Sequence, residues 1–147
     1  MHNARNFFSA AEKQAIRQRI EQAELNTSGE IRVHIDTFCK EDVLDRAAYL
    51  FDKLQMNQTA KRNGVLIYIA VRDKKFAIIG DAGIHSMVED NFWQDVLQQM
   101  ELHFKRGEFS AGIQVAIKRA GEKLKRFFPY QSDDINELSD EISYGND

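Results

Sequence analysis

The side chains best suited to chemistry in this sequence are those that carry carboxylate or amide oxygens. Several of them lie where loops meet apolar runs. Asp81 sits between Gly80 and Gly83, directly after one apolar segment, while Asn63 precedes a second segment and Glu30 begins a third. Hard divalent cations such as Ca²⁺ and Mg²⁺ bind carboxylate and carbonyl oxygens that converge from separate segments. Asp81, Asn63 and Glu30 are therefore candidate metal ligands.

The C-terminal residues 131–147 add six acidic side chains and contain no lysine or arginine. Asp133, Asp134 and Glu137 are further candidate ligands, because they reach the same edge of the sheet if this tail folds back onto the domain. The stretch 133–137 lacks the central glycine and the distal glutamate of an EF-hand, so that specific motif is rejected. The alternative is that Asp81 caps a helix and that the tail is acidic for solubility.

Familiar catalytic motifs are absent. The sequence contains no GxxxxGK[ST], GxSxG, HExxH or CxxC pattern, and its lone cysteine, Cys39, excludes an internal disulfide. Asp81 and His85 are the nominees for a nucleophile or a general base. His85 also has a structural interpretation, because hard cations prefer oxygen to nitrogen ligands.

The strands that position these residues follow from hydrophobic patterning. Residues 65–71 are uniformly apolar, which is typical of a central strand buried on both faces. The short polar break 72–75 predicts an antiparallel hairpin with 76–79. Residues 30–36 alternate strictly, and helical spacing over 41–55 makes a parallel βαβ unit with the strand at 65. This topology predicts that Glu30, Asn63 and Asp81 lie at the same edge of the sheet.

Helices complete the predicted fold. Ser9 and Glu12 form a capping box for the first helix. Helical patterns cover residues 10–26, 41–55, 86–105 and 110–128. We expect an α/β fold, namely a three-layer αβα sandwich with a small mixed sheet of three or four strands and about four helices. Residues 1–130 form the domain, and 131–147 form an acidic tail that docks on it, with a short edge strand within 141–144.

The polar positions of the first strand, Glu30, Arg32, His34 and Asp36, share one face. Such a row could be a site. It is also typical of a face that is solvated or covered by another polar segment.

Charge and hydropathy limit the function classes. Residues 1–130 carry 20 basic against 17 acidic groups, short of the clustered basic stripe of a nucleic-acid binder, so we expect no nucleic-acid partner. No apolar run has the length of a membrane span. The first residues lack the apolar core of a signal peptide, so we expect a cytoplasmic location. We also expect a monomer.

Four segments in order resemble the TPM domain family, and the resemblance covers residues 7–128. The segments are 27–33 (TSGEIRV), 62–67 (RNGVLI), 75–84 (KFAIIGDAGI) and 106–113 (RGEFSAGI). The resemblance implies an αβα fold, acid phosphatase activity in plant members, and binding of divalent cations such as calcium in some members. The family motif residues carried over are Asn63, Gly64, Gly80, Asp81 and Gly83, with Glu108 in the place often held by Asp.

Three functional hypotheses follow. The first is a Ca²⁺- or Mg²⁺-binding regulatory or interaction module with an unknown protein partner, its ligands drawn from Asp81, Glu30, Asn63, Asp133, Asp134, Glu137 and Glu108. The second is a metal-assisted acid-phosphatase-like hydrolase, in which the cation activates water. The third is a metal-free protein-interaction scaffold.

Overall fold

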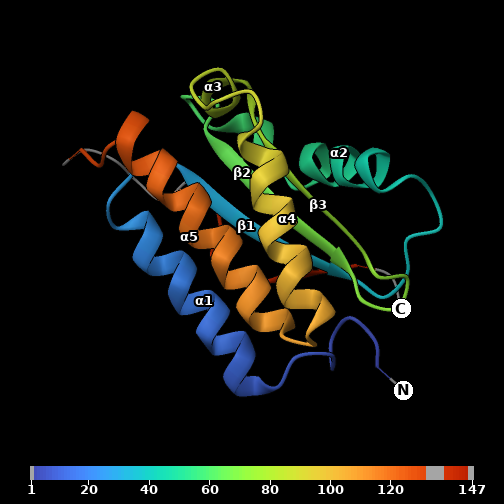
Figure 1. Cartoon of the computed structure of the whole chain (residues 1–147). Coiled ribbons are helices and arrows are strands. Elements are labelled where there is room, and N and C mark those ends of the chain that lie inside the picture. The colour runs from blue at the N-terminus through green and yellow to red at the C-terminus, as the bar shows by residue number, and fades with distance from the viewer. Residues whose placement is uncertain (1, 132–137, 146–147) are drawn as a thin grey trace.

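A mixed sheet of four strands forms the middle layer of the molecule (Figure 1). The computed structural model describes residues 2–131 and 138–145. The strands are β1 (Glu30–Asp36), β2 (Gly64–Ala70), β3 (Lys75–Gly80) and β4 (Ser143–Tyr144). The helices are α1 (Ala10–Glu24), α2 (Val43–Lys53), α3 (Ala82–His85), α4 (Phe92–Lys105) and α5 (Phe109–Phe127), with a 3₁₀ turn η1 (Met56–Gln58). The α/β fold class predicted from the sequence is confirmed.

The strand order is β3-β2-β1-β4, and β4 of the C-terminal segment lies on one edge. Strands β1 and β2 pair in parallel with Glu30 opposite Gly64, whereas β3 returns antiparallel with Gly80 opposite Val65. The Asp81 N–H donates to Gly64 O at 2.9 Å, and the Glu30 N–H donates to Asn63 O at 3.3 Å. These backbone bonds place Glu30, Asn63 and Asp81 at one end of the sheet, as the topology predicted.

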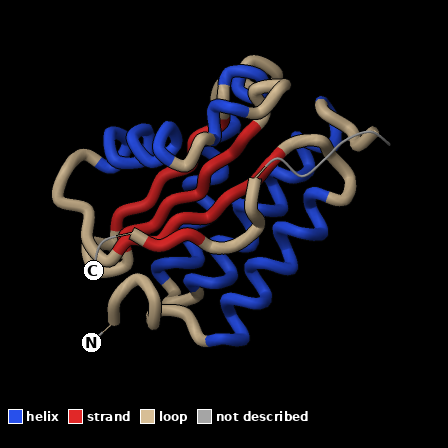
Figure 2. The backbone as a smooth tube through the Cα atoms, turned by 180° about the vertical axis from the view of Figure 1, so that it is seen from behind, coloured by secondary structure: helices blue, strands red, loops and turns tan. Residues whose placement is uncertain are grey.

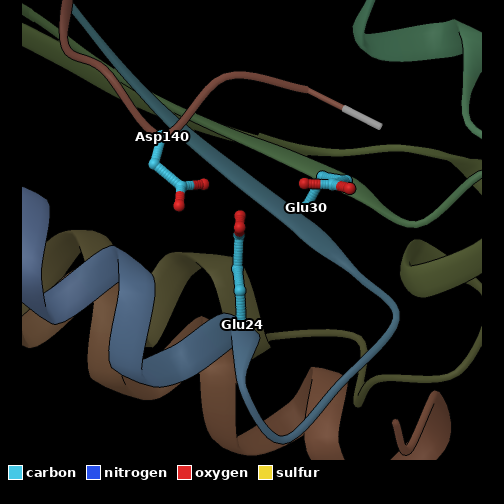
Figure 3. A group of neighbouring side chains, drawn as sticks. All are labelled: Glu24, Glu30 and Asp140. Atoms are coloured by element: carbon cyan, nitrogen blue, oxygen red, sulfur yellow. The ribbon is translucent and has the colours of Figure 1, made fainter. Parts of the chain in front are cut away.

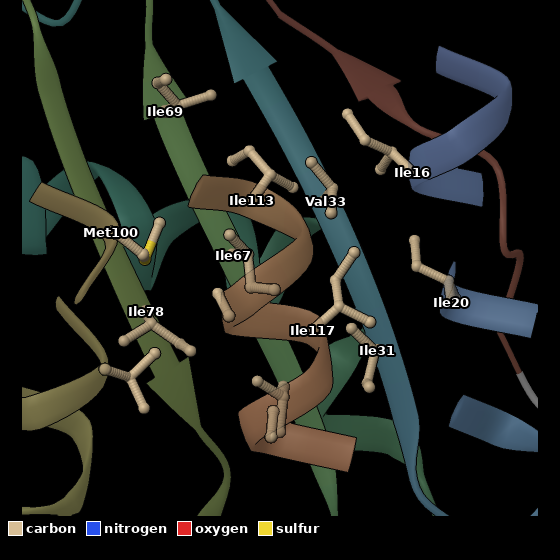
Figure 4. Close-up of a cluster of buried hydrophobic side chains, with 14 of the residues drawn as sticks. Ile16, Ile20, Ile31, Val33, Ile67, Ile69, Ile78, Met100, Ile113 and Ile117 are labelled. Carbon is tan, nitrogen blue, oxygen red and sulfur yellow. The ribbon is translucent and has the colours of Figure 1, made fainter. Parts of the chain in front are cut away.

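Helices cover both faces of the sheet. Helices α1, α4 and α5 lie on one face and α2 lies on the other, and Figure 2 shows the α2 face with the long helices behind it. The odd positions of β1 and β2 bury their apolar side chains against α1 and α5 (Figure 4). The labelled members of this cluster are Ile16, Ile20, Ile31, Val33, Ile67, Ile69, Ile78, Met100, Ile113 and Ile117. Among the described helices, none combines the length and the hydropathy needed to cross a membrane.

The predicted helix over 86–105 is divided in the structure. Helix α3 begins earlier, at Ala82, because the Asp81 carboxylate accepts from the Ala82 N–H at 2.8 Å and caps it. Helix α3 ends at His85, next to Ser86, whose Oγ donates to Gly83 O at 3.0 Å. Helix α4 starts only at Phe92. The division gives five α-helices among the described residues, where the sequence predicted about four.

Gly83 is required by close backbone packing. An added Cβ at this position would lie 2.2 Å from Lys61 O and 2.6 Å from Arg62 O. The Gly83 N–H also donates to Arg62 O at 2.8 Å, so the loop before β2 and α3 are held together. Backbone atoms cannot move aside as the end of a flexible side chain can.

We therefore expect Gly83→Ala to lower the free energy of unfolding by about 1–3 kcal/mol, because the new methyl group overpacks this contact. Urea denaturation measures the change. Ala82→Ser, at the exposed neighbouring position, is the control and should shift stability by less than about 0.5 kcal/mol. Equal stability of Gly83→Ala and the unaltered protein would contradict the packing argument.

Candidate metal site at the start of β1

Three carboxylates from separate parts of the chain meet beside the first residue of β1 (Figure 3). Glu24, Glu30 and Asp140 each offer an oxygen, and these oxygens all lie within 4.8 Å of one another. Glu30 is buried and the other two are half-buried. Like charges this close repel one another strongly away from water, so the cluster favours either a bound proton or a bound cation.

Each carboxylate is positioned by a different element. Glu24 is the last residue of α1, and its Oε2 accepts the Ile31 N–H at 2.8 Å. Glu30 opens β1, where the backbone bond to Asn63 fixes its place. Asp140 precedes β4, whose pairing with β1 brings the C-terminal segment to this position. The neighbouring Glu141 adds a surface ion pair with Arg17 at 3.0 Å.

The electrostatics of the cluster centre on Glu24. Burial, the side-chain hydrogen bond with Asp140 and the charge of Glu30 raise the pKa of Glu24 from 4.5 to about 10. The hydrogen bond from the Ile31 N–H acts in the opposite direction but is outweighed. The Glu24 carboxyl is therefore protonated at neutral pH when no cation is bound.

Asn63 lies at the same end of the sheet and is almost fully buried, with 1% of its surface exposed. Its Nδ2 lies 3.3 Å from Ser28 Oγ. Its Oδ1 is buried and has no hydrogen-bond partner among the described residues. A buried amide oxygen without a donor has an unmet electrostatic requirement, which a cation or a water molecule could satisfy.

Asp81 and His85 are already engaged by neighbouring side chains. The Asp81 carboxylate accepts from Arg62 Nε at 2.6 Å and from Arg62 Nη2 at 2.8 Å, in addition to capping α3. His85 Nδ1 accepts from Trp93 Nε1 at 3.1 Å. The geometry thus gives Asp81 the helix-capping role that the sequence left open, with an arginine as its charge partner.

The remaining predicted ligands are not in this cluster. Glu108 precedes α5 and contacts His103 Nδ1 at 3.0 Å, at the corner between α4 and α5. That corner packs near the start of β3 through the Phe76–Phe104 ring contact, at the opposite end of the sheet from Glu30. Asp133, Asp134 and Glu137 lie outside the described residues.

The polar row of β1 is covered, which was one of the two interpretations of its alternating pattern. Asp36 is fully buried and accepts from Arg46 Nε at 2.8 Å and from Tyr68 OH at 2.6 Å. His34 Nε2 lies 3.0 Å from Asp36 Oδ1, and His34 Nδ1 lies 2.7 Å from Ser143 Oγ of β4. Burial raises the pKa of Asp36, but the hydrogen bonds from His34, Arg46 and Tyr68 outweigh it and hold the pKa below its usual range.

Sequence reasoning did not identify Glu24 or Asp140 as ligands. In the helical pattern Glu24 has the ordinary position of an acidic residue near a helix end, and Asp140 is one of several tail acids. One signal was available, because Glu24 and Glu30 flank the turn between α1 and β1. Their proximity to each other could be inferred from that short connection, whereas the approach of Asp140 could not.

A family model of the TPM domain matches residues 2–123. The NMR structure of the BA42 protein from the psychrophilic bacterium Bizionia argentinensis is 46% identical, with a TM-score of 0.89, and covers 99% of this chain and 100% of that one. Among curated proteins, none matches the chain.

Two more distant structures show the fold alone. An N-terminal domain of a P. gingivalis protein is 15% identical with a TM-score of 0.68, covering 82% of this chain and 78% of that one. The N-terminal domain of cg2496 from Corynebacterium glutamicum is 14% identical with a TM-score of 0.61, covering 80% and 74%.

The raised pKa of Glu24 makes stability depend on pH. A carboxyl whose folded pKa exceeds its unfolded value contributes stability that is fully present below the unfolded pKa and is lost as pH rises toward the folded one. In EDTA we expect the free energy of unfolding to fall between pH 5 and pH 9, with a slope of up to about 1.4 kcal/mol per pH unit from this group. Urea denaturation at pH 5, 7 and 9 measures it.

Glu24→Gln keeps the side-chain length and removes the titration, so this contribution to the slope should disappear. Glu21→Gln, on the exposed surface of α1, is the matched control and should keep it. An unchanged slope in Glu24→Gln would show that the group is not buried against other carboxylates.

Proposed function

This chain belongs to the TPM domain family, and from that premise we propose that it is a divalent-cation-binding module whose ligands include Glu24, Glu30 and Asp140. The observation that carries the proposal is the convergence of three carboxylate oxygens, within 4.8 Å of one another, from three separate segments. The donor set is all oxygen, which suits Ca²⁺ or Mg²⁺ and is a poor match for softer metals.

The surroundings give a divalent cation a way to replace the proton on Glu24. Glu24 holds its proton at neutral pH because burial and its neighbours disfavour three negative charges. A divalent cation removes that penalty by supplying positive charge at the same place. The Oδ1 atom of Asn63, another predicted ligand, is a buried oxygen at the same end of the sheet that lacks a donor among the described residues.

Cation binding would link three segments of the chain. Glu24 belongs to α1, Glu30 to β1 and Asp140 to the segment that leads into β4, so one ion would join a helix, the sheet and the C-terminal segment. Without the ion, docking of that segment brings Asp140 beside Glu30 and requires Glu24 to hold a proton. We infer that the cation controls how firmly the C-terminal segment is held, and that this is the regulatory output of the domain.

Cation binding should stabilise the fold through linkage, by about 2.7 kcal/mol when the free ion is at 100 times its Kd. Thermal melts in EDTA, in Ca²⁺ and in Mg²⁺ measure this gain. At pH 7 calorimetric titration in buffers of different ionisation enthalpy should show about one proton released for each cation bound, because Glu24 must lose its proton to serve as a ligand.

The variants separate this site from other carboxylates. Asp140→Asn should weaken cation affinity by about tenfold or more, in line with the sensitivity of metal sites to their surrounding ligands. Glu24→Gln should weaken it and also abolish proton release. Glu141→Gln is the matched control, because Glu141 is next to Asp140 in the sequence but pairs with Arg17 at the surface and lies outside the cluster.

Asp81→Asn and Glu108→Gln test the remaining sequence-predicted ligands that the structure describes, and both should retain the full gain from the cation. A melt that is identical in EDTA and in millimolar Ca²⁺ or Mg²⁺ would refute the proposal and leave a metal-free interaction scaffold. A gain that Asp81→Asn abolishes and Asp140→Asn preserves would move the site to the loop after β3.

A further inference from the structure

A cavity lies at the other end of the sheet from the acidic cluster. It has a volume of about 370 Å³, is partly open to solvent, and is bordered by the β2–β3 hairpin on one side and by the corner between α4 and α5 on the other. Cavities of this size are within the range that binds small organic molecules. Neither the acidic cluster nor the Asp36 network contributes to its lining.

The walls of the cavity are largely aromatic. Phe76 from β3, Phe104 from α4 and Phe109 from α5 line it, and all three are only half-buried. Phe104 lies edge to face with Phe76 at 5.0 Å and stacks near Phe109 at 5.4 Å between ring centroids. Partly exposed aromatic rings that line a pocket can bind the apolar part of a ligand.

The charged groups at this cavity are two lysines and one glutamate. Lys105 pairs with Glu101 at 3.2 Å, so those two charges offset each other. The Lys74 ammonium forms no hydrogen bond or ion pair with any residue in the described part of the chain. Its neighbour Lys75, by contrast, donates to Cys39 O at 2.8 Å and to Glu41 O at 3.1 Å.

Lys74 also has an unusual backbone conformation. Its φ of 55° lies in the left-handed region, which a glycine or an asparagine adopts at lower cost. A lysine thus lines an aromatic cavity at a position where local backbone preference favours another residue. Strained residues of this kind concentrate at ligand-binding positions.

We propose that this cavity binds a small organic anion with an aromatic or branched apolar body, such as an aromatic carboxylate or sulfonate. The three phenylalanine rings take the body of the ligand, and Lys74 pairs with its anionic group. The positive charge of Lys74 would repel a cationic ligand, and a neutral ligand would gain no ion pair from it. The site needs no metal ion and is independent of the proposed cation site.

Gly112 contributes to the shape of the cavity. An added Cβ at this position would lie 2.5 Å from Phe104 Cε1, so the glycine gives the Phe104 ring its present position. Gly112→Ala therefore displaces an aromatic wall while it leaves every lysine in place.

The probe for this site is 1-anilinonaphthalene-8-sulfonate, an aromatic anion, with the uncharged N-phenyl-1-naphthylamine as its comparison. Both are titrated into the full chain in EDTA, and amide chemical shifts are recorded by NMR. We expect saturable sulfonate binding, tighter than that of the uncharged probe, with the largest shifts in residues 69–76 and 101–109.

Lys74→Gly should keep the fold, because glycine favours the left-handed conformation, and should weaken sulfonate binding by about three- to five-fold without changing binding of the uncharged probe. Lys118→Ala, which removes an equal charge that does not line the cavity, should bind the sulfonate as the unaltered protein does. Gly112→Ala should weaken both probes.

Equal sulfonate affinity in Lys74→Gly and the unaltered protein would refute the proposal. Largest shifts outside residues 69–76 and 101–109, or no binding up to millimolar probe, would also refute it. Since the measurements are made in EDTA, their outcome does not depend on whether the domain binds a cation.

Discussion

The buried carboxylate of Asp36 is the interaction on which the arrangement of layers depends. It accepts hydrogen bonds from Arg46 of α2 and Tyr68 of β2, and His34 links it to Ser143 of β4. Breaking a buried ion pair by removing one partner costs about 3–5 kcal/mol, because the other charge is left uncompensated away from water. The α2 layer, two central strands and the C-terminal segment are therefore held in one mutual position.

Two groups of acidic side chains, one at each end of β1, have different electrostatic partners. Asp36 has a cationic partner within the chain, and its hydrogen bonds hold its pKa below the usual range. Glu24, Glu30 and Asp140 bring three carboxyl groups together, and burial with these neighbours raises the pKa of Glu24 to about 10. The C-terminal segment completes both groups, so its docking is coupled to each. A place where folding brings carboxyl groups together is a natural site for an external cation to act.

The proposed sites divide the domain between the two ends of its sheet. The carboxylates lie where β1 and β2 begin, and the aromatic cavity lies where β2 ends and β3 begins. Binding a cation at one end therefore leaves the other end free to accept a different ligand. The relative BA42, 46% identical over nearly the full length of both chains, offers a natural comparison for both sites.

Much of the fold followed from sequence because its signals are local. Alternation over Glu30–Asp36 predicted β1 with its observed bounds, and the Ser9–Glu12 capping box was confirmed at the start of α1. Hairpin and βαβ topology also placed Glu30, Asn63 and Asp81 at one end of the sheet. Periodicity and capping depend on residues a few positions apart, which the sequence displays directly.

The composition of the site was decided by the tertiary structure. Whether Asp81 faces a cation or Arg62 depends on how the loop before β2 packs on α3, and the structure gives it Arg62. The meeting of Glu24 with Asp140 joins residues from opposite ends of the chain, and no local pattern encodes it. Sequence therefore determined the elements and their order, while long-range packing determined which charges end as partners.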